Sequence, residues 1–167
     1  MYREEPLIYI NGSPFVLRQE AVSLRNVKSY ASISTSRLEL LEERLKSDCL
    51  AEAKLFDGRL LLHTELLSDG TVIPIWETID SPSSVKTLKE VMSDVAKKMR
   101  IEEARLLYRR IPITAERAPD FADVRDIVEL VATIDLDEAI VVNCQLGKST
   151  SPKFCALFAN MIHHRSR

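Results

Sequence analysis

Apolar residues recur at helical spacing in several stretches of the chain. Between residues 36 and 54 they form a single stripe, and Ser36 followed by Glu39 has the spacing of a capping box, so a helix is predicted there. The residues of that stripe are Leu38, Leu41, Leu45 and Ala53. The same periodicity predicts further helices over residues 84–99, 120–134 and 152–164.

Short apolar runs separated by turn residues predict strands in the first half of the chain. Leu7–Ile10 and Phe15–Leu17 flank Asn11-Gly12, a dipeptide typical of a tight hairpin turn, and Pro14 makes the second arm an edge. A second pattern of this kind consists of Leu60–His63, the turn Ser68-Asp69-Gly70, and Val72–Trp76.

Strands alternate with helices in the second half of the chain. Arg105–Ile111 is predicted as an apolar strand that leads into Pro112, and Ala139–Val142 as a buried strand. This alternation predicts an α/β domain with a largely parallel sheet, in which ligands bind beyond the carboxyl ends of the strands. Cys144 follows one such end.

The stretch from Ile140 to Thr150 carries the strongest chemical signal. An apolar strand leads Cys144 into a short polar loop, and a helix is predicted to begin near Thr150 or Ser151. Backbone N–H groups at such a junction point at an anion, and the helix dipole lowers the pKa of a cysteine there, so a phosphate site or a thiolate nucleophile is predicted. The predicted phosphate-binding residues are Gln145, Leu146, Gly147, Lys148, Ser149, Thr150 and Ser151.

Composition limits the alternatives. The chain has 167 residues, enough for one domain with a sizeable core, and its formal charge of −2 gives no global attraction to nucleic acid or to anionic membranes. No secretory leader or membrane-spanning run is visible, and the three cysteines match neither a disulfide framework nor a metal site. We therefore expect a soluble, cytoplasmic protein without a metal or cofactor.

A nucleotide-binding P-loop is a competing interpretation of Gly147-Lys148-Ser149-Thr150. A P-loop ends in Gly-Lys-Ser/Thr between a strand and a helix. Its first glycine would fall at Val142, inside the predicted strand, and no downstream strand supplies an acidic magnesium ligand. The spacing therefore disfavours a nucleotide triphosphatase.

Several segments lie in the order and approximate spacing of a known family. They are Asn11-Gly12-x-Pro14-Phe15-Val16-Leu17-Arg18, Leu61-Leu62-His63, Asp69-Gly70, Trp76-Glu77, Tyr108 to Thr114, Ala118-Pro119, and Val142 to Gly147. Together they resemble the paladin and protein-tyrosine-phosphatase-like inositol polyphosphate phosphatase (phytase-like) group. The resemblance spans most of the chain and implies a cysteine-phosphatase fold, with an arginine clamp in the loop and an aspartate acid on a separate loop.

Some positions match the residues that the resemblance implies for catalysis. Cys144 matches the nucleophile, and Gly147 matches the loop glycine that lets backbone approach an anion. Ser151 matches the hydroxyl that follows the arginine and helps the thiolate to leave.

Other positions depart from the family pattern. Thr150 stands where the arginine clamp is expected, and Ala115 where the acid is expected; Glu116, one residue later, is a weak candidate for the acid. Ser149 replaces a preferred glycine. Because clamp and acid act in the transition state, their joint loss predicts a pseudophosphatase with a structural, regulatory or phosphate-binding role.

An active phosphatase is the alternative hypothesis. Cys144 would be its nucleophile, Glu116 its acid, and Lys148 or an arginine from another repeat its clamp. The substrates would be inositol polyphosphates, phosphoinositides or phosphoproteins.

The resemblance also suggests the context of the chain. Such repeats often occur in tandem, so residues 1–167 are expected to be one phosphatase-like domain within a longer multi-repeat protein. The expected partners are neighbouring repeats of that protein and a phosphorylated small molecule or phospholipid headgroup. No nucleic-acid partner is expected.

Other residues that could take part in catalysis or ligand binding are expected to have structural roles. Cys49 and Cys155 lie on helical stripes and are expected to be buried and inert. His63, His163 and His164 are expected to cap helices or lie on the surface, and Trp76 to pack in the core or at its rim. Arg109 and Arg110 alternate at a strand end, so one of them is expected to face solvent, and a surface ion pair is the simplest interpretation. Pairing of Arg117 with Asp120 is an equally simple one.

Overall fold

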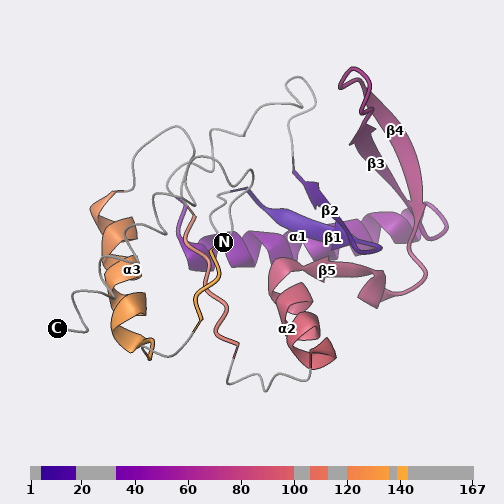
Figure 1. Cartoon of the computed structure of the whole chain (residues 1–167). Helices are drawn as coiled ribbons and strands as arrows, with labels where there is room; N and C mark the ends of the chain where they lie inside the picture. The colour runs from indigo at the N-terminus through magenta and orange to yellow at the C-terminus, as the bar shows by residue number, and fades with distance from the viewer. Residues whose placement is uncertain (1–4, 18–32, 100–105, 113–119, 136–138, 143–167) are drawn as a thin grey trace. The chain divides into compact units, whose positions relative to one another are not determined.

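The computed structural model describes residues 5–17, 33–99, 106–112, 120–135 and 139–142 (Figure 1). The chain divides into two compact units. The hairpin unit comprises Pro6–Leu17 and Glu39–Tyr108, and the terminal unit comprises Met1–Glu5, Arg18–Leu38 and Arg109–Arg167. The described residues contain both helices and strands, which confirms the mixed α/β prediction.

The first sheet of the hairpin unit is built on the predicted N-terminal hairpin. Strands β1 (Leu7–Ile10) and β2 (Ser13–Val16) pair antiparallel, and Ile10 lies opposite Ser13. Asn11 and Gly12 both have positive φ, at 50° and 84°, which is the backbone that a tight hairpin of this hand requires. The hairpin prediction is therefore confirmed.

A third strand completes this sheet and corrects the prediction of a helix over residues 84–99. After the 3₁₀ turn η3 (Pro82–Ser84), β5 (Val85–Thr87) pairs antiparallel with β1, so the strand order is β2-β1-β5. Helix α2 (Leu88–Lys98) begins only after it. The reason is a capping box at Thr87, whose hydroxyl accepts from the Glu90 N–H while the Glu90 carboxylate accepts from the Thr87 N–H.

The second sheet is the predicted hairpin of β3 (Arg59–Glu65) and β4 (Val72–Thr78). The Thr71 N–H donates to the Asp69 carboxylate at 2.9 Å, and Gly70 takes a φ of 75°. The backbone N–H of Leu66 closes the turn by donating to the Thr71 carbonyl at 2.9 Å. The predicted turn is thus confirmed with the residues that motivated it.

Helix α1 (Thr35–Leu55) confirms the predicted helix over residues 36–54. Its start differs, because the Arg37 N–H donates to the Ser34 hydroxyl at 3.4 Å, so Ser34 rather than Ser36 caps the helix. The helix ends where Asp57 and Gly58 adopt positive φ, and the Gly58 N–H donates to the Ala53 carbonyl at 2.8 Å.

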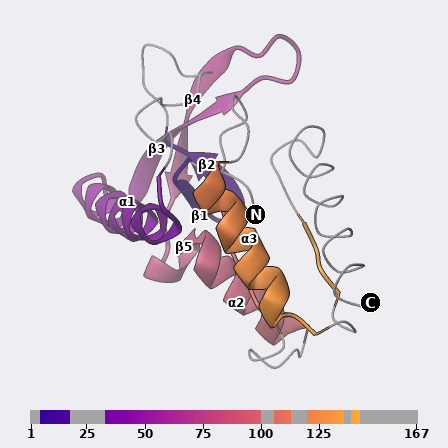
Figure 2. The ribbon, with the colours of Figure 1, turned by 90° about the vertical axis from the view of Figure 1, so that its left-hand side faces the viewer.

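The core of the hairpin unit lies between α1 and the two sheets. Its fully buried members are Ile8, Ile10, Leu60 and Val85. Leu45, Cys49 and Leu50 of α1 pack against this cluster, which explains why the helix lies beside β1 and β5 in the end-on view of Figure 2. Apolar burial of this kind is the main driving force for folding.

In the terminal unit, helix α3 (Phe121–Thr133) confirms the helix predicted over residues 120–134. Asp120 caps it by accepting from the Asp123 N–H at 3.0 Å, and the Asp123 carboxylate accepts from the Asp120 N–H in return. Ile127 and Val131, one turn apart, are buried. The predicted helix over residues 152–164 lies outside the described residues.

The predicted parallel sheet is not found among the described strands. Every pairing there is antiparallel. Strands β1 and β2, and strands β3 and β4, are joined by tight turns, which cannot connect parallel strands. Residues 106–111 form no strand, and the Arg110 carbonyl accepts a hydrogen bond from the Thr35 hydroxyl. Residues 139–142 also form no strand, and Val141 is 80 % exposed, so this run is not buried as predicted.

Candidate active site

The predicted catalytic residues fall outside the part of the chain that the structure describes. This holds for Cys144, for Glu116 and Ala115, and for the whole predicted phosphate loop. The described residues nearest to them in sequence are 139–142, which precede the loop, and 106–112, which precede the segment with Glu116. Their roles therefore remain predictions, and the structure contributes the segments that lead to them.

The segment that leads to Glu116 is anchored at Arg110. The Arg110 guanidinium donates to the Glu5 carbonyl at 2.8 Å, and the Arg110 carbonyl accepts from the Thr35 hydroxyl at 2.7 Å. Ile111 and Pro112, which follow, are buried. These contacts fix the backbone just before residue 113, within the terminal unit.

The expectation that one of Arg109 and Arg110 faces solvent is confirmed, but a surface ion pair at Arg110 is wrong, because Arg110 is the buried one. Arg110 is only 2 % exposed, whereas Arg109 beside it is exposed. A guanidinium is costly to bury without hydrogen-bond acceptors, and the carbonyl of Glu5 supplies one. The sequence held no sign of this, because Glu5 lies 105 residues away along the chain.

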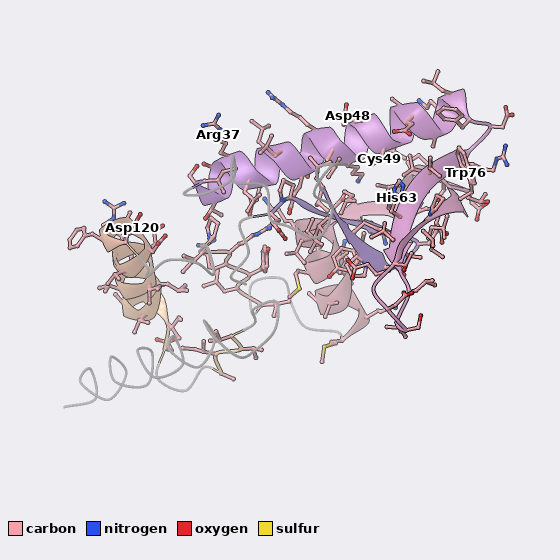
Figure 3. The ribbon with its side chains drawn as sticks, turned by 90° about the horizontal axis from the view of Figure 1, so that it is seen from above. Arg37, Asp48, Cys49, His63, Trp76 and Asp120 are labelled. Atoms are coloured by element: carbon pink, nitrogen blue, oxygen red, sulfur yellow. The ribbon has the colours of Figure 1, made fainter. Side chains whose placement is uncertain are left out.

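Cys49 is the cysteine that the structure describes, and it is not a second nucleophile. It lies on α1 and packs against the core of the hairpin unit, on the side of the helix away from Asp48 (Figure 3). Burial, followed by the negative charges of Glu52 and Asp48, raises the pKa of its thiol to about 11. The thiol is therefore protonated at neutral pH, as the prediction of an inert cysteine requires.

Two carboxylates of α2 have pKa values that are lowered by structural contacts. Burial raises the pKa of Glu90, but hydrogen bonds from Lys46 and from the Thr87 N–H outweigh it and leave the pKa lowered. The hydrogen bond from Lys86 lowers the pKa of Asp94, again with a smaller opposing effect of burial. Both groups stabilise α2 and its contacts and do not point to a catalytic acid.

His63 and Trp76 lie on the outer face of the β3–β4 hairpin, where both are exposed (Figure 3). Trp76 is 51 % exposed and packs beside Phe56, with ring centroids 5.7 Å apart, so it lies at the rim and not in the core. In the part of the chain that the structure describes, no cluster of His, Cys, Asp or Glu side chains could hold a metal ion.

The sequence analysis missed a buried acidic residue that organises the hairpin unit. Glu42 is 1 % exposed, and its carboxylate accepts from the Leu7 N–H at 2.8 Å, which ties α1 to the start of β1. A signal was present, because Glu42 follows Leu38 by one helical turn and so lies on the apolar stripe of α1. An acidic residue on such a stripe becomes buried, and its carboxylate then requires a hydrogen-bond donor.

None of the helices within the described ranges is both long enough and apolar enough to cross a bilayer.

The mixed α/β architecture and the cysteine loop of the sequence are features of cysteine-dependent phosphatases. The profile of the protein-tyrosine-phosphatase-like phytase family, described as inositol hexakisphosphate, matches residues 1–159. The chain therefore belongs to this family. Searches of curated proteins and of solved structures gave no match.

Proposed function

We propose that this chain is a catalytically degenerate member of its family, which binds a phosphorylated ligand without hydrolysing it. The observation that carries the proposal is a double substitution in the sequence. Thr150 stands at the position of the arginine clamp and Ala115 at the position of the acid, in a chain that matches the family over residues 1–159.

The two lost groups act at opposite ends of the reaction. Transfer of a phosphoryl group to a thiolate places charge on the equatorial oxygens, which an arginine holds with two parallel hydrogen bonds. The departing alkoxide needs a proton, which the acid supplies. Threonine and alanine provide neither, and removing one such interaction costs about 3 kcal/mol of transition-state stabilisation.

The described residues offer no evident replacement for these groups. Arg110 is the arginine just before the segment with Ala115, but its buried guanidinium is used to hold the Glu5 carbonyl. This contact supports the loss of catalysis.

The proposed ligand is an inositol phosphate. The family profile names inositol hexakisphosphate, and the predicted loop from Gln145 to Ser151 would offer backbone N–H donors to a phosphate. Lys148 would add one positive charge. Without a bidentate arginine, binding is expected to be weak and to fall as salt rises.

An active phosphatase is the second candidate, because the chain belongs to a phosphatase-like family whose description names a phosphorylated compound. In that case Cys144 is the nucleophile and Glu116 the acid, and Lys148 or an arginine from another repeat replaces the clamp. A neighbouring repeat with a complete cysteine-to-arginine loop would favour the noncatalytic role for this domain. We propose that the domain belongs to such a multi-repeat protein.

Titration of the full chain with inositol hexakisphosphate tests the binding role. Chemical-shift changes at residues 144–151 should saturate, and Lys148→Ala should weaken binding several-fold. Lys97→Ala, which removes an exposed lysine of α2, is the matched control and should leave binding unchanged. No shift at millimolar ligand would eliminate the binding role and leave only a structural one.

A further inference from the structure

Two backbone hydrogen bonds fix which residues of β3 face its partner strand β4. The Leu66 N–H donates to the Thr71 carbonyl at 2.9 Å, and the Ile79 N–H donates to the Gly58 carbonyl at 2.7 Å. Both pairs continue the register of the β3–β4 ladder. In an antiparallel ladder such bonds recur at every second residue, so the N–H and C=O groups of the residues between them point away from β4.

The outer edge of β3 is open. The residues whose backbone groups point outward there are Arg59, Leu61, His63 and Glu65, and all four are exposed. The Arg59 N–H donates to the Phe56 carbonyl, but no described residue bonds to the outward N–H and C=O groups of the other three. Leu61, His63 and Glu65 are called the open edge. A row of unpaired backbone groups of this kind is a template for another strand.

The outer edge of β4 is blocked. By the same alternation Pro74 and Thr78 face outward on that side. Pro74 has no N–H to donate, and the Thr78 carbonyl already accepts from the side-chain amide of Asn11 at 3.0 Å. Proline on an edge is a common protection against strand addition. An added strand can therefore extend this two-stranded sheet only beside β3.

The sequence of β3 is complementary to itself. When two copies of Arg59–Glu65 run antiparallel about a two-fold axis at Leu62, all seven residues are paired. Arg59 then lies opposite Glu65 of the second copy, and Leu61 lies opposite His63 of the second copy. Opposite charges directly across a strand pair are stabilising. Within the described residues neither Arg59 nor Glu65 forms an ion pair that would compete.

Charge also excludes the neighbouring two-fold registers. An axis at Leu61 would place Asp57 opposite Glu65 of the second copy, and like charges directly opposite are destabilising. An axis at His63 would place the two His63 side chains opposite each other and Glu65 opposite a leucine. The axis at Leu62 is therefore preferred. This self-complementarity favours a second copy of the chain over an unrelated strand.

We propose that the chain self-associates through the open edge and forms a four-stranded antiparallel sheet of order β4-β3-β3-β4. A sheet of two strands is marginally stable by itself, and the added pairing doubles its width. The proposal is independent of the phosphate-binding role, because every residue that carries it belongs to the hairpin unit and none to the predicted loop.

Sedimentation velocity on the full chain over a range of concentrations tests the charge pairing. The native chain should dimerise. Glu65→Arg brings a positive charge opposite Arg59 of the second copy, so this variant should weaken the dimer at least about tenfold, since two such pairs change. Arg59→Glu should do the same. An equimolar mixture of the two variants should restore association to within about threefold of the native chain, because each supplies the charge that the other lacks.

Controls separate this effect from a general change of charge or of fold. Glu43→Arg makes the same substitution at an exposed position of α1 and should change association less than about twofold. His63→Pro removes one N–H of the open edge and should weaken the dimer, whereas His63→Ala keeps that N–H and should associate like the native chain. Circular dichroism verifies that every variant folds.

Three results would overturn the proposal. They are a native chain that stays monomeric at about 100 µM, a dimer that neither Glu65→Arg nor His63→Pro weakens, and a mixture of Glu65→Arg with Arg59→Glu that associates no better than either variant alone. A monomeric native chain whose open edge instead binds a strand of unrelated sequence would assign the edge to another occupant.

Discussion

At the scale of single residues, buried polar groups explain much of how this chain is held together. Arg110 joins residues of the terminal unit that are far apart in sequence, through the Glu5 carbonyl and the Thr35 hydroxyl. Glu42 performs a similar task in the hairpin unit by accepting from the Leu7 N–H. Such groups are costly to bury and are stabilising only while their partners remain in place.

Replacing Arg110 should therefore destabilise the protein. Arg110→Met keeps an apolar chain of similar length but leaves the Glu5 carbonyl without this donor, and we expect a loss of about 2 kcal/mol in the free energy of unfolding. Urea denaturation measures it. Arg109→Met, at the exposed neighbouring position, should lose less than about 0.5 kcal/mol. Equal losses in the two variants would show that Arg110 is not the anchor.

Cys49 should resist alkylation in the folded protein. Its thiol has a pKa of about 11 against an ordinary value of 9.0, so at neutral pH its thiolate fraction is about a hundredfold lower than that of a free thiol. The measurement is the rate of iodoacetamide labelling in a Cys144→Ser, Cys155→Ser variant, with and without denaturant. Fast labelling of the folded variant at pH 7 would contradict the assignment of Cys49 as a half-buried, inert residue.

At the scale of secondary-structure elements, structure that is set by neighbouring residues could be predicted, and structure that is set by contacts distant in sequence could not. Asn11-Gly12 and Asp69-Gly70 fix their turns through their own backbone and side-chain preferences, so both hairpins could be predicted from sequence. Strand β5 could not, because its three residues become a strand only through pairing with β1. The burial of Arg110 could not be predicted for the same reason, since the carbonyl that accepts its hydrogen bond belongs to Glu5.

The capping box of α2 should make stability depend on pH in a defined direction. The pKa of Glu90 is lowered below its ordinary value of 4.5 in the folded protein, so its contribution is fully present above that value and is lost as pH falls through the lowered pKa. Glu90→Gln should lose about 0.5 kcal/mol near neutral pH, since the pair with Lys46 is partly exposed. The difference in the free energy of unfolding between Glu90→Gln and the native chain should vanish in acid.

Thermal unfolding at a series of pH values tests this expectation. Glu43→Gln, at an exposed position of α1, is the control and should follow the native chain at every pH. A Glu90→Gln deficit that stays constant into strong acid would show that the carboxylate charge is not its source.

At the scale of the whole molecule, the proposed function rests on the family assignment and on the predicted loop. The sequence resemblance to a phytase-like phosphatase is confirmed by the family profile over residues 1–159. Whether the loop from Cys144 to Ser151 cradles an anion stays a prediction, because its residues lie outside those that the structure describes. The sequence predicts this loop because an apolar run, a cysteine, a glycine and a predicted helix follow one another there, although the structure has no strand at residues 139–142.

Restoring both missing groups should raise activity more than restoring either one alone. Thr150→Arg together with Ala115→Asp should raise the hydrolysis of inositol hexakisphosphate above that of the native chain, while either change alone should give less. Nucleophile, clamp and acid act as a unit, so their effects are not additive. Ser149→Gly in the double variant tests whether that side chain still distorts the loop. Activity from Ala115→Asp alone would show that the clamp has been replaced elsewhere.

The most direct test of lost catalysis is phosphate release by the native chain beside Cys144→Ser, with inositol hexakisphosphate and a generic aryl phosphate as substrates. The account predicts that the two proteins release phosphate at the same background rate, because Thr150 and Ala115 supply neither clamp nor acid. A rate above background that disappears in Cys144→Ser would contradict it and establish an active phosphatase.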